Sequence, residues 1–233
     1  MVAAEVFGQH EEKKEIVSWL TQPDQIKEDA KIVFANHLSI FSIVGVGGMG
    51  KTTPAQLVCN DSDVVKCFDL SIWVWVSNNF DAATVIRMIL ESVDKKNPTV
   101  DALETLKRIL IQKLSCKEFL LVLDDVWEDG RRNEWEKLMT PLQTGQKGSK
   151  ILLTTRMQSV ADMDRAQLVV NQKLNGLDED NSLVLFKRHT FAGMALEGCA
   201  EFLLTGEQIV KKMRGLSLID KSSCWAFERQ YDT

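Results

Sequence analysis

The sequence predicts an α/β fold in which helices cover both faces of a parallel β-sheet. Short apolar, β-prone runs alternate along the chain with segments whose apolar residues recur at helical spacing. One run leads directly into a glycine-rich turn and then a helical segment, an order typical of parallel sheets. The composition agrees, because 45% of the 233 residues are hydrophobic and 26% are charged, an ordinary mixture for a soluble domain with a sizeable core.

The individual elements follow from local patterns. Apolar, β-prone runs predict strands at residues 40–44, 72–77, 119–123 and 150–155, with a short fifth strand at 168–170. Helical spacing predicts helices at residues 11–20, 55–58, 80–93, 103–114 and 135–139. Residues 21–37 are polar and predict a loop. Beyond residue 175 the pattern turns helical, over 183–191 and again over 202–213.

The most informative segment, residues 45–53, reads Gly-Val-Gly-Gly-Met-Gly-Lys-Thr-Thr and is a complete phosphate-binding loop. Its glycines let the backbone curl until several N–H groups converge, and the next helix adds free N–H groups and a positive dipole end. Lys51 can reach the β- and γ-phosphates, and the Thr52 hydroxyl can ligate Mg²⁺. The strand–loop–helix setting favours this over a glycine-rich turn that binds nothing. The candidate phosphate contacts are Gly45, Gly47, Gly48, Met49, Gly50, Lys51, Thr52 and Thr53.

Pro54 is the unusual residue of this segment. Proline is accepted in the first turn of a helix and costs more beyond it. If the helix begins near Gly50, the Pro54 ring should press on the Gly50 carbonyl. We then expect local strain and weaker nucleotide affinity.

The third strand leads into two acidic residues, Asp124 and Asp125. A buried strand that delivers a carboxylate at its carboxyl end is the usual partner of a phosphate loop. We expect Asp124 to hold Mg²⁺ through water and Asp125 to orient or deprotonate an attacking water. The pair could instead cap a helix or begin a turn. The intact loop upstream favours the first interpretation.

The fourth strand leads into Arg156. An arginine at this edge of the sheet can contact a γ-phosphate through charge-assisted hydrogen bonds. The alternative is a surface arginine at the start of a helix. We favour phosphate sensing.

Composition and charge exclude several classes of function. A formal net charge of −5 argues against a nucleic-acid-binding surface. The five cysteines are scattered, without zinc-like or redox-like spacing, which predicts reduced thiols in a cytoplasmic protein. The apolar runs fall short of the roughly 18 residues that span a membrane, and the amino terminus shows no secretory signal.

The order of these motifs resembles the NB-ARC nucleotide-binding domain of plant intracellular disease-resistance proteins. The likeness covers residues 5–219, and the segments around 68–77 and Trp127 look like the coiled-coil class of these receptors. The matching segments are residues 6–8 (Val-Phe-Gly), 45–53, 68–77, 120–127, 148–156, 183–191 and 215–218.

The resemblance implies a P-loop NTPase sheet in which the Asp124 strand lies two places from the loop strand, followed by a small, incomplete helical ARC subdomain. The change to a helical pattern beyond residue 175 places a domain boundary near residue 172. With the resemblance, it divides the chain into a P-loop nucleotide-binding domain, a partial helical ARC subdomain and an atypical carboxyl-terminal tail, over residues 1–172, 173–219 and 220–233. The resemblance also implies a switch, in which ADP holds the receptor closed, exchange for ATP opens it for immune signalling with protein partners, and slow hydrolysis resets it.

The resemblance also implies roles for single residues. The backbone of Val6, Phe7 and Gly8 would border the adenine. Lys51 and Asp125 would support hydrolysis, while Arg156 would sense the phosphate. Thr52 and Asp124 would hold Mg²⁺.

The chain departs from the family pattern at Pro54, Gln9 and Ser217, where the family usually has Leu, Arg and Pro. The family's Met-His-Asp segment, leucine-rich repeats and amino-terminal coiled coil are absent, which predicts a fragment, a truncated gene product or the result of a reading-frame change. Two alternatives therefore stay open: an active ATPase or phosphotransferase, and a truncated decoy that binds nucleotide weakly.

Overall fold

Five parallel strands form the centre of the molecule. The structure is a computed structural model, and it describes residues 10–22, 38–76, 80–127, 132–162, 169–173 and 178–190, together with Gln208 and Val210. The strands are β1 (Ser39–Val44), β2 (Leu70–Trp75), β3 (Phe119–Val126), β4 (Lys150–Thr155) and β5 (Val169–Lys173). They lie in the order β2-β3-β4-β1-β5, and every neighbouring pair is parallel.

This strand order brings the predicted motifs to one edge of the sheet. β3, which carries Asp124, lies two places from β1, as the family resemblance implied. β4, which leads into Arg156, lies between them. The carboxyl ends of parallel strands meet at the same edge, and so the loop after β1 faces the ends of β3 and β4.

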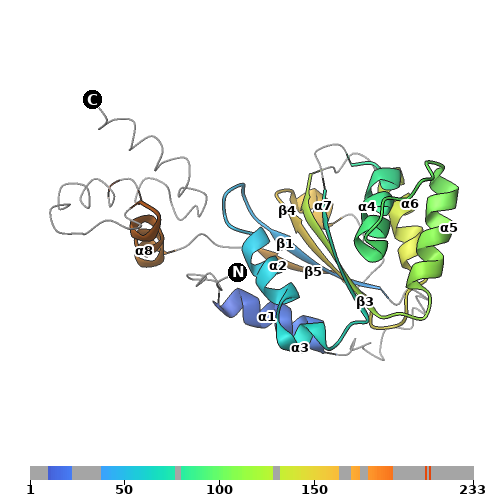
Figure 1. The fold of residues 1–233 in the computed structure, drawn as a ribbon. Helices are drawn as coiled ribbons and strands as arrows, with labels where there is room; N and C mark the ends of the chain where they lie inside the picture. Colours follow the sequence, from blue (N-terminus) through green and yellow to red (C-terminus); the bar gives the residue numbers. More distant parts are fainter. Residues whose placement is uncertain are drawn as a thin grey trace.

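Helices cover both faces of the sheet, as predicted (Figure 1). One face carries α1 (His10–Thr21), α2 (Thr52–Cys59) and α3 (Ser62–Val65). The other carries α4 (Ala82–Asp94), α5 (Leu103–Leu114) and α6 (Arg132–Leu142). α7 (Gln158–Ala161) follows β4, and α8 (Glu179–Thr190) follows β5 and stands apart from the sheet. The prediction lacked α3 and α7, because four residues are too few to show a helical period.

Two apolar cores lie on the two faces of the sheet, and strand residues contribute to them alternately. In β4, Leu152 packs into the core beneath α1, α2 and α3, whereas Ile151 and Leu153 pack beneath α4, α5 and α6. β3 alternates in the same way. Burial on both faces explains why the sequence showed continuous apolar runs rather than alternation of apolar and polar residues.

Lys150 fastens α1 to the sheet. Its side chain is only 3% exposed. The Nζ donates hydrogen bonds to the carbonyls of Trp19, Leu20 and Gln22, at 2.8, 3.1 and 2.7 Å. It also lies 4.9 Å from the centroid of the Trp19 ring. A cation at the carboxyl end of a helix satisfies its last carbonyls and complements its dipole.

Element boundaries differ from the predictions by a few residues. The helix predicted from residue 80 begins at Ala82, because Asp81 caps it by accepting a hydrogen bond from the Thr84 N–H at 2.8 Å. β3 extends three residues beyond 123, which places both predicted acidic residues inside the strand. The short helix predicted at 135–139 is the 11-residue α6.

Several predictions lie wholly or partly outside the described residues. β5 runs one residue past the boundary proposed at 172, and the division into domains stays a prediction. Of the helix predicted at 202–213 only Gln208 and Val210 are described, and both are helical. The described residues do not include 1–9, where Val6, Phe7, Gly8 and Gln9 lie. They also do not include most of the loop predicted at 21–37, the segment at 215–218 or the tail at 220–233. In the part of the chain that is described, no helix is long and apolar enough to cross a membrane.

Candidate functional site

The predicted phosphate loop leaves β1 and turns sharply into α2. The Gly45 N–H donates to the Thr155 carbonyl at 3.1 Å, which ties the start of the loop to β4. Gly48 and Gly50 have φ angles of +86° and +79°. Side chains are disfavoured at such angles, which explains the glycines at these two positions.

Pro54 fits this geometry better than the sequence suggested. The helix begins at Thr52 and not near Gly50, and so the premise of our prediction was wrong. Pro54 is its third residue, where the N–H would have no partner within the helix. The Gly50 carbonyl instead accepts a hydrogen bond from the Thr53 N–H at 3.0 Å. The effect of Pro54 on affinity stays a prediction.

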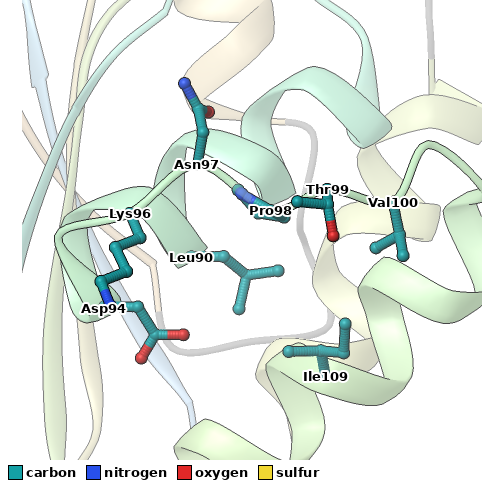
Figure 2. Close-up of a pocket in the computed structure, with 8 residues that line it drawn as sticks. All are labelled: Leu90, Asp94, Lys96, Asn97, Pro98, Thr99, Val100 and Ile109. Carbon is teal, nitrogen blue, oxygen red and sulfur yellow. The ribbon is translucent and has the colours of Figure 1, made fainter.

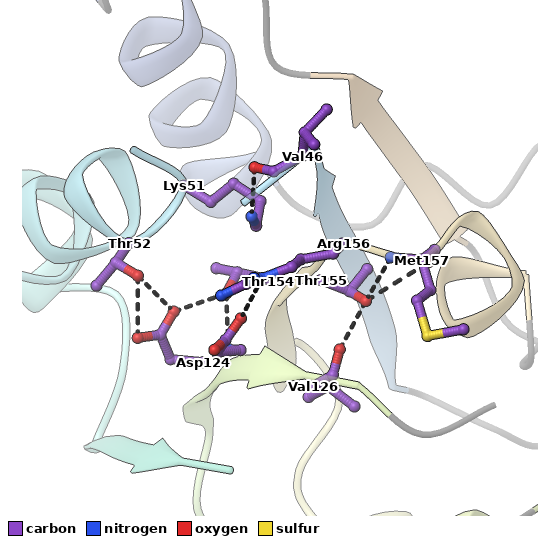
Figure 3. A network of polar contacts seen from close by, with 10 residues as sticks. Val46, Lys51, Thr52, Asp124, Val126, Thr154, Thr155, Arg156 and Met157 are labelled. Carbon is purple, nitrogen blue, oxygen red and sulfur yellow. Dashed lines mark hydrogen bonds and ion pairs between the residues drawn. The ribbon is translucent and has the colours of Figure 1, made fainter. Parts of the chain in front are cut away.

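Lys51 is buried at the base of the loop and only 6% exposed. Its Nζ donates a hydrogen bond to the Val46 carbonyl at 3.1 Å, across the turn (Figure 3). Burial lowers the pKa of Lys51, and the nearby guanidinium of Arg156 lowers it further, while Asp125 and Asp124 oppose the shift. An anion bound in the loop would offset the cost of burying this ammonium group.

Asp124 lies against the start of α2, as the predicted metal site requires. The Thr52 hydroxyl donates to its two carboxylate oxygens at 3.0 and 3.1 Å (Figure 3). The Thr154 hydroxyl donates to Asp124 Oδ1 at 2.6 Å. Asp124 is 4% exposed. Hydrogen bonds from two hydroxyl groups therefore satisfy this buried side chain.

Asp125 lies in a β-bulge that the sequence did not predict. Leu123 pairs with Leu153 and Val126 with Thr155, so β3 advances three residues while β4 advances two. The extra residue, Asp125, has a φ of +60°. Its N–H donates to the Thr154 hydroxyl at 2.8 Å, and its carboxylate lies 3.5 Å from Arg156 Nε. The bulge directs the two neighbouring carboxylates to different partners.

Arg156 lies beside the loop, as predicted, but it is already engaged by the protein. Its guanidinium carbon is 3.9 Å from the centroid of the Trp127 ring. A Cβ atom placed on Gly47 would come within 2.6 Å of Arg156 Nη1, so the guanidinium would have to move if any other residue stood there. The guanidinium thus contacts Trp127, Asp125 and the loop. No sequence pattern indicated the contact between Arg156 and Trp127.

The residues present fit a bound Mg²⁺ ion. Among the described residues there is no group of three or more His, Cys, Asp or Glu side chains that could hold a metal by themselves. Mg²⁺ does not require one, because it keeps several waters and takes one or two protein oxygens plus phosphate oxygens. Thr52 Oγ1 and Asp124 Oδ1, 3.0 Å apart, supply oxygens of this kind.

A separate cavity of about 440 Å³ lies on the opposite face of the sheet (Figure 2). It opens between α4, α5 and the chain that joins them. Asp94 at its rim is paired with Lys113 at 2.6 Å. No residue predicted for the phosphate site lines it. The lining residues are Leu90, Asp94, Lys96, Asn97, Pro98, Thr99, Val100 and Ile109.

The chain matches one protein family over most of its length. The model of the NB-ARC domain matches residues 14–195. Disease resistance protein RGA2 of Solanum bulbocastanum is 34% identical over 220 residues, covering 94% of this chain and 21% of that protein. Disease resistance RPP13-like protein 4 of Arabidopsis thaliana is 35% identical over 221 residues, covering 94% of this chain and 24% of that protein. The chain thus spans between a fifth and a quarter of the length of these relatives.

Solved structures share the fold at low sequence identity. CDC6P from Pyrobaculum aerophilum aligns with a TM-score of 0.66 at 15% identity, over 97% of this chain and 64% of that chain. The ORC2 protein of Aeropyrum pernix, in ADPNP–ADP complexes, aligns with a TM-score of 0.54 at 15% identity, over 81% of this chain and 53% of that chain. Both matches confirm the predicted α/β architecture.

Proposed function

Because this chain belongs to the NB-ARC domain family, we propose that it is an adenine-nucleotide switch of a plant disease-resistance protein, bound to ADP in one state and ATP in the other. The observation that carries the proposal is the arrangement of Lys51, Thr52 and Asp124. These three groups come from the loop, the start of α2 and the end of β3, and they meet at one edge of the sheet.

The loop and the buried lysine would bind the phosphates. The first turn of α2, with the positive end of the helix dipole, attracts phosphate oxygens. Lys51 adds a positive charge that is already desolvated, so its attraction for phosphate is weakly screened. When Mg²⁺ is bound by Thr52 and Asp124, it would neutralise phosphate charge.

The surroundings of Asp125 support slow hydrolysis. A general base needs a carboxylate that is free to accept a proton from water. Asp125 lies 3.5 Å from Arg156 Nε, so its carboxylate is already engaged by the protein and is less available to an attacking water. Phosphate near Gly47 would compete with Asp125 for Arg156, which gives the arginine two alternative partners and makes it a sensor of the nucleotide.

The wider biological role rests on the relatives and the motif order. Their names assign them to disease resistance, and on that basis we propose protein partners in immune signalling. The coiled-coil class and a cytoplasmic location belong to the same proposal, as does the absence of a nucleic-acid ligand.

Thermal unfolding with Mg²⁺ and ADP or ATP tests the proposal. Ligand at 100 times its Kd should add about 2.7 kcal/mol to the free energy of unfolding. Lys51→Ala should remove most of this gain, whereas Lys147→Ala, at an exposed turn position, should keep it. An unchanged melting temperature for the original chain would contradict nucleotide binding. Turnover in the range of roughly 1–100 s⁻¹, typical of kinases, would contradict slow hydrolysis.

A further inference from the structure

We propose that Thr154 is a positioning residue, whose hydroxyl orients Asp124 toward Mg²⁺ and holds the backbone of Asp125 in the β-bulge. The inference rests on the proposed function, because it presumes a metal ion beside Asp124. It adds a residue that neither the motifs nor the family resemblance singled out.

The hydrogen bonds of Thr154 use its hydroxyl as both donor and acceptor. The hydroxyl has one hydrogen, which it donates to Asp124 Oδ1 at 2.6 Å. Its oxygen accepts the Asp125 N–H at 2.8 Å. Thr154 is only 1% exposed, so bulk water does not compete for either bond. One oxygen atom therefore joins two consecutive residues of β3 to β4.

The β-bulge explains why a hydroxyl is needed at this position. The extra residue in β3 shifts the pairing between Leu123 and Val126, and Asp125 lies within that shift. Its N–H bonds to the side chain of Thr154 rather than to a strand carbonyl. An unpaired N–H at this depth would cost free energy, so loss of the hydroxyl should loosen the bulge.

Thr154 differs from the other hydroxyl that reaches Asp124. Thr52 also donates to Asp124, but it is itself a proposed ligand of the metal. Thr154 contacts the carboxylate from the neighbouring strand and so acts through Asp124. Such outer partners fix the orientation of a metal ligand, and their loss typically lowers metal affinity 10–100-fold.

The Mg²⁺ dependence of ADP binding tests this inference in the full chain. Thr154→Val preserves the shape of the side chain and removes the hydroxyl, and Thr154→Ser restores it. We expect the Mg²⁺ concentration for half-maximal thermal stabilisation by ADP to rise about tenfold or more in Thr154→Val. ADP affinity measured in EDTA should be unchanged, and Thr154→Ser should titrate like the original chain.

Thr155→Val is the matched control, because it removes a buried hydroxyl that donates to the Val126 carbonyl at 2.7 Å, one residue along β4. It should leave the Mg²⁺ titration unchanged. If Thr154→Val titrates like the original chain, or loses ADP affinity equally in EDTA, Thr154 does not position the metal ligand. If Thr154→Val does not fold, Thr154→Ala is measured instead and judged by the same criteria. Absence of ADP binding by the original chain would instead refute the proposed function.

Discussion

The two faces of the sheet differ in what they bury. Beneath α4, α5 and α6, the inward-facing residues of β3 and β4 are apolar as far as Leu123 and Leu153, after which the buried Thr155 bonds to the Val126 carbonyl. The apolar residues are Phe119, Leu121, Leu123, Ile151 and Leu153. Beneath α1, α2 and α3, both strands combine apolar residues with buried polar ones. The apolar members on this face are Leu120, Val122 and Leu152, and the polar ones are Asp124, Lys150 and Thr154.

This difference shows how one sheet separates stability from chemistry. The apolar face depends on packing, which tolerates changes that conserve volume. The mixed face depends on matched hydrogen bonds, because a buried polar group that loses its partner costs more than the bond contributed. Lys150 is matched by three carbonyls, and Asp124 by two hydroxyls. The first set anchors α1, and the second holds the proposed metal ligand.

The largest expected effect on stability is on the apolar face. Leu153→Ala should lower the free energy of unfolding by about 2–5 kcal/mol, because it leaves a cavity in a close-packed core. The ADP affinity of the folded fraction should not change, since Leu153 faces away from α2. Urea denaturation measures the first quantity and calorimetry the second. A large loss of ADP affinity would show that the two faces are not separate.

A smaller and more local effect is expected on the mixed face. Lys150→Met keeps the length of the side chain but leaves the carbonyls of Trp19, Leu20 and Gln22 without their donor. We expect a loss of about 1–3 kcal/mol. Amide hydrogen exchange should speed up in α1 more than in α5, because the lost hydrogen bonds are those to the carbonyls at the carboxyl end of α1.

The matched control for that experiment is Lys13→Met, which removes an ion pair with Asp61 of 2.7 Å in a more solvent-exposed setting. It should cost no more than about 1 kcal/mol. Equal destabilisation by Lys13→Met and Lys150→Met would contradict the assignment of Lys150 as the anchor of α1.

The smallest expected effect is a pH dependence at the rim of the apolar face. Hydrogen bonds from the Thr84 side chain and N–H lower the pKa of Asp81, and partial burial opposes this. Because the folded-state pKa is the lower one, the capping contribution is complete above the unfolded pKa of about 3.9 and is lost as the pH falls through the folded value. Water screens this half-buried carboxylate, so the loss should stay below about 1 kcal/mol.

Asp81→Asn isolates this contribution, because asparagine also caps helices but does not titrate. The stability difference between Asp81→Asn and the original chain should be constant from pH 6 to pH 8 and should shift in favour of the variant below about pH 4. Urea denaturation across this range measures it. A difference that does not change with pH would contradict the role of the Asp81 charge.

Local patterns were sufficient for much of this molecule. The strands at β1, β3 and β4, the helices at α1, α4 and α5 and the phosphate loop each depend on residues close together in the chain, where apolar spacing and glycine positions act directly. Resemblance supplied the relation of the Asp124 strand to the loop strand. Spacing alone left the strand order open, because an apolar run buried on both faces fits any central position in a sheet.

Contacts between distant segments decided the rest. The anchoring of α1 joins Lys150 to residues about 130 positions earlier, and the bulge that separates Asp124 from Asp125 forms only when β3 pairs with β4. The stacking of Arg156 on Trp127 likewise needs both strand ends in place. Hydrogen bonds and ring contacts of this kind depend on distance in space, which a one-dimensional pattern does not contain. The sequence therefore identified which groups are suited to phosphate and metal chemistry, and the folded sheet determined which of them meet.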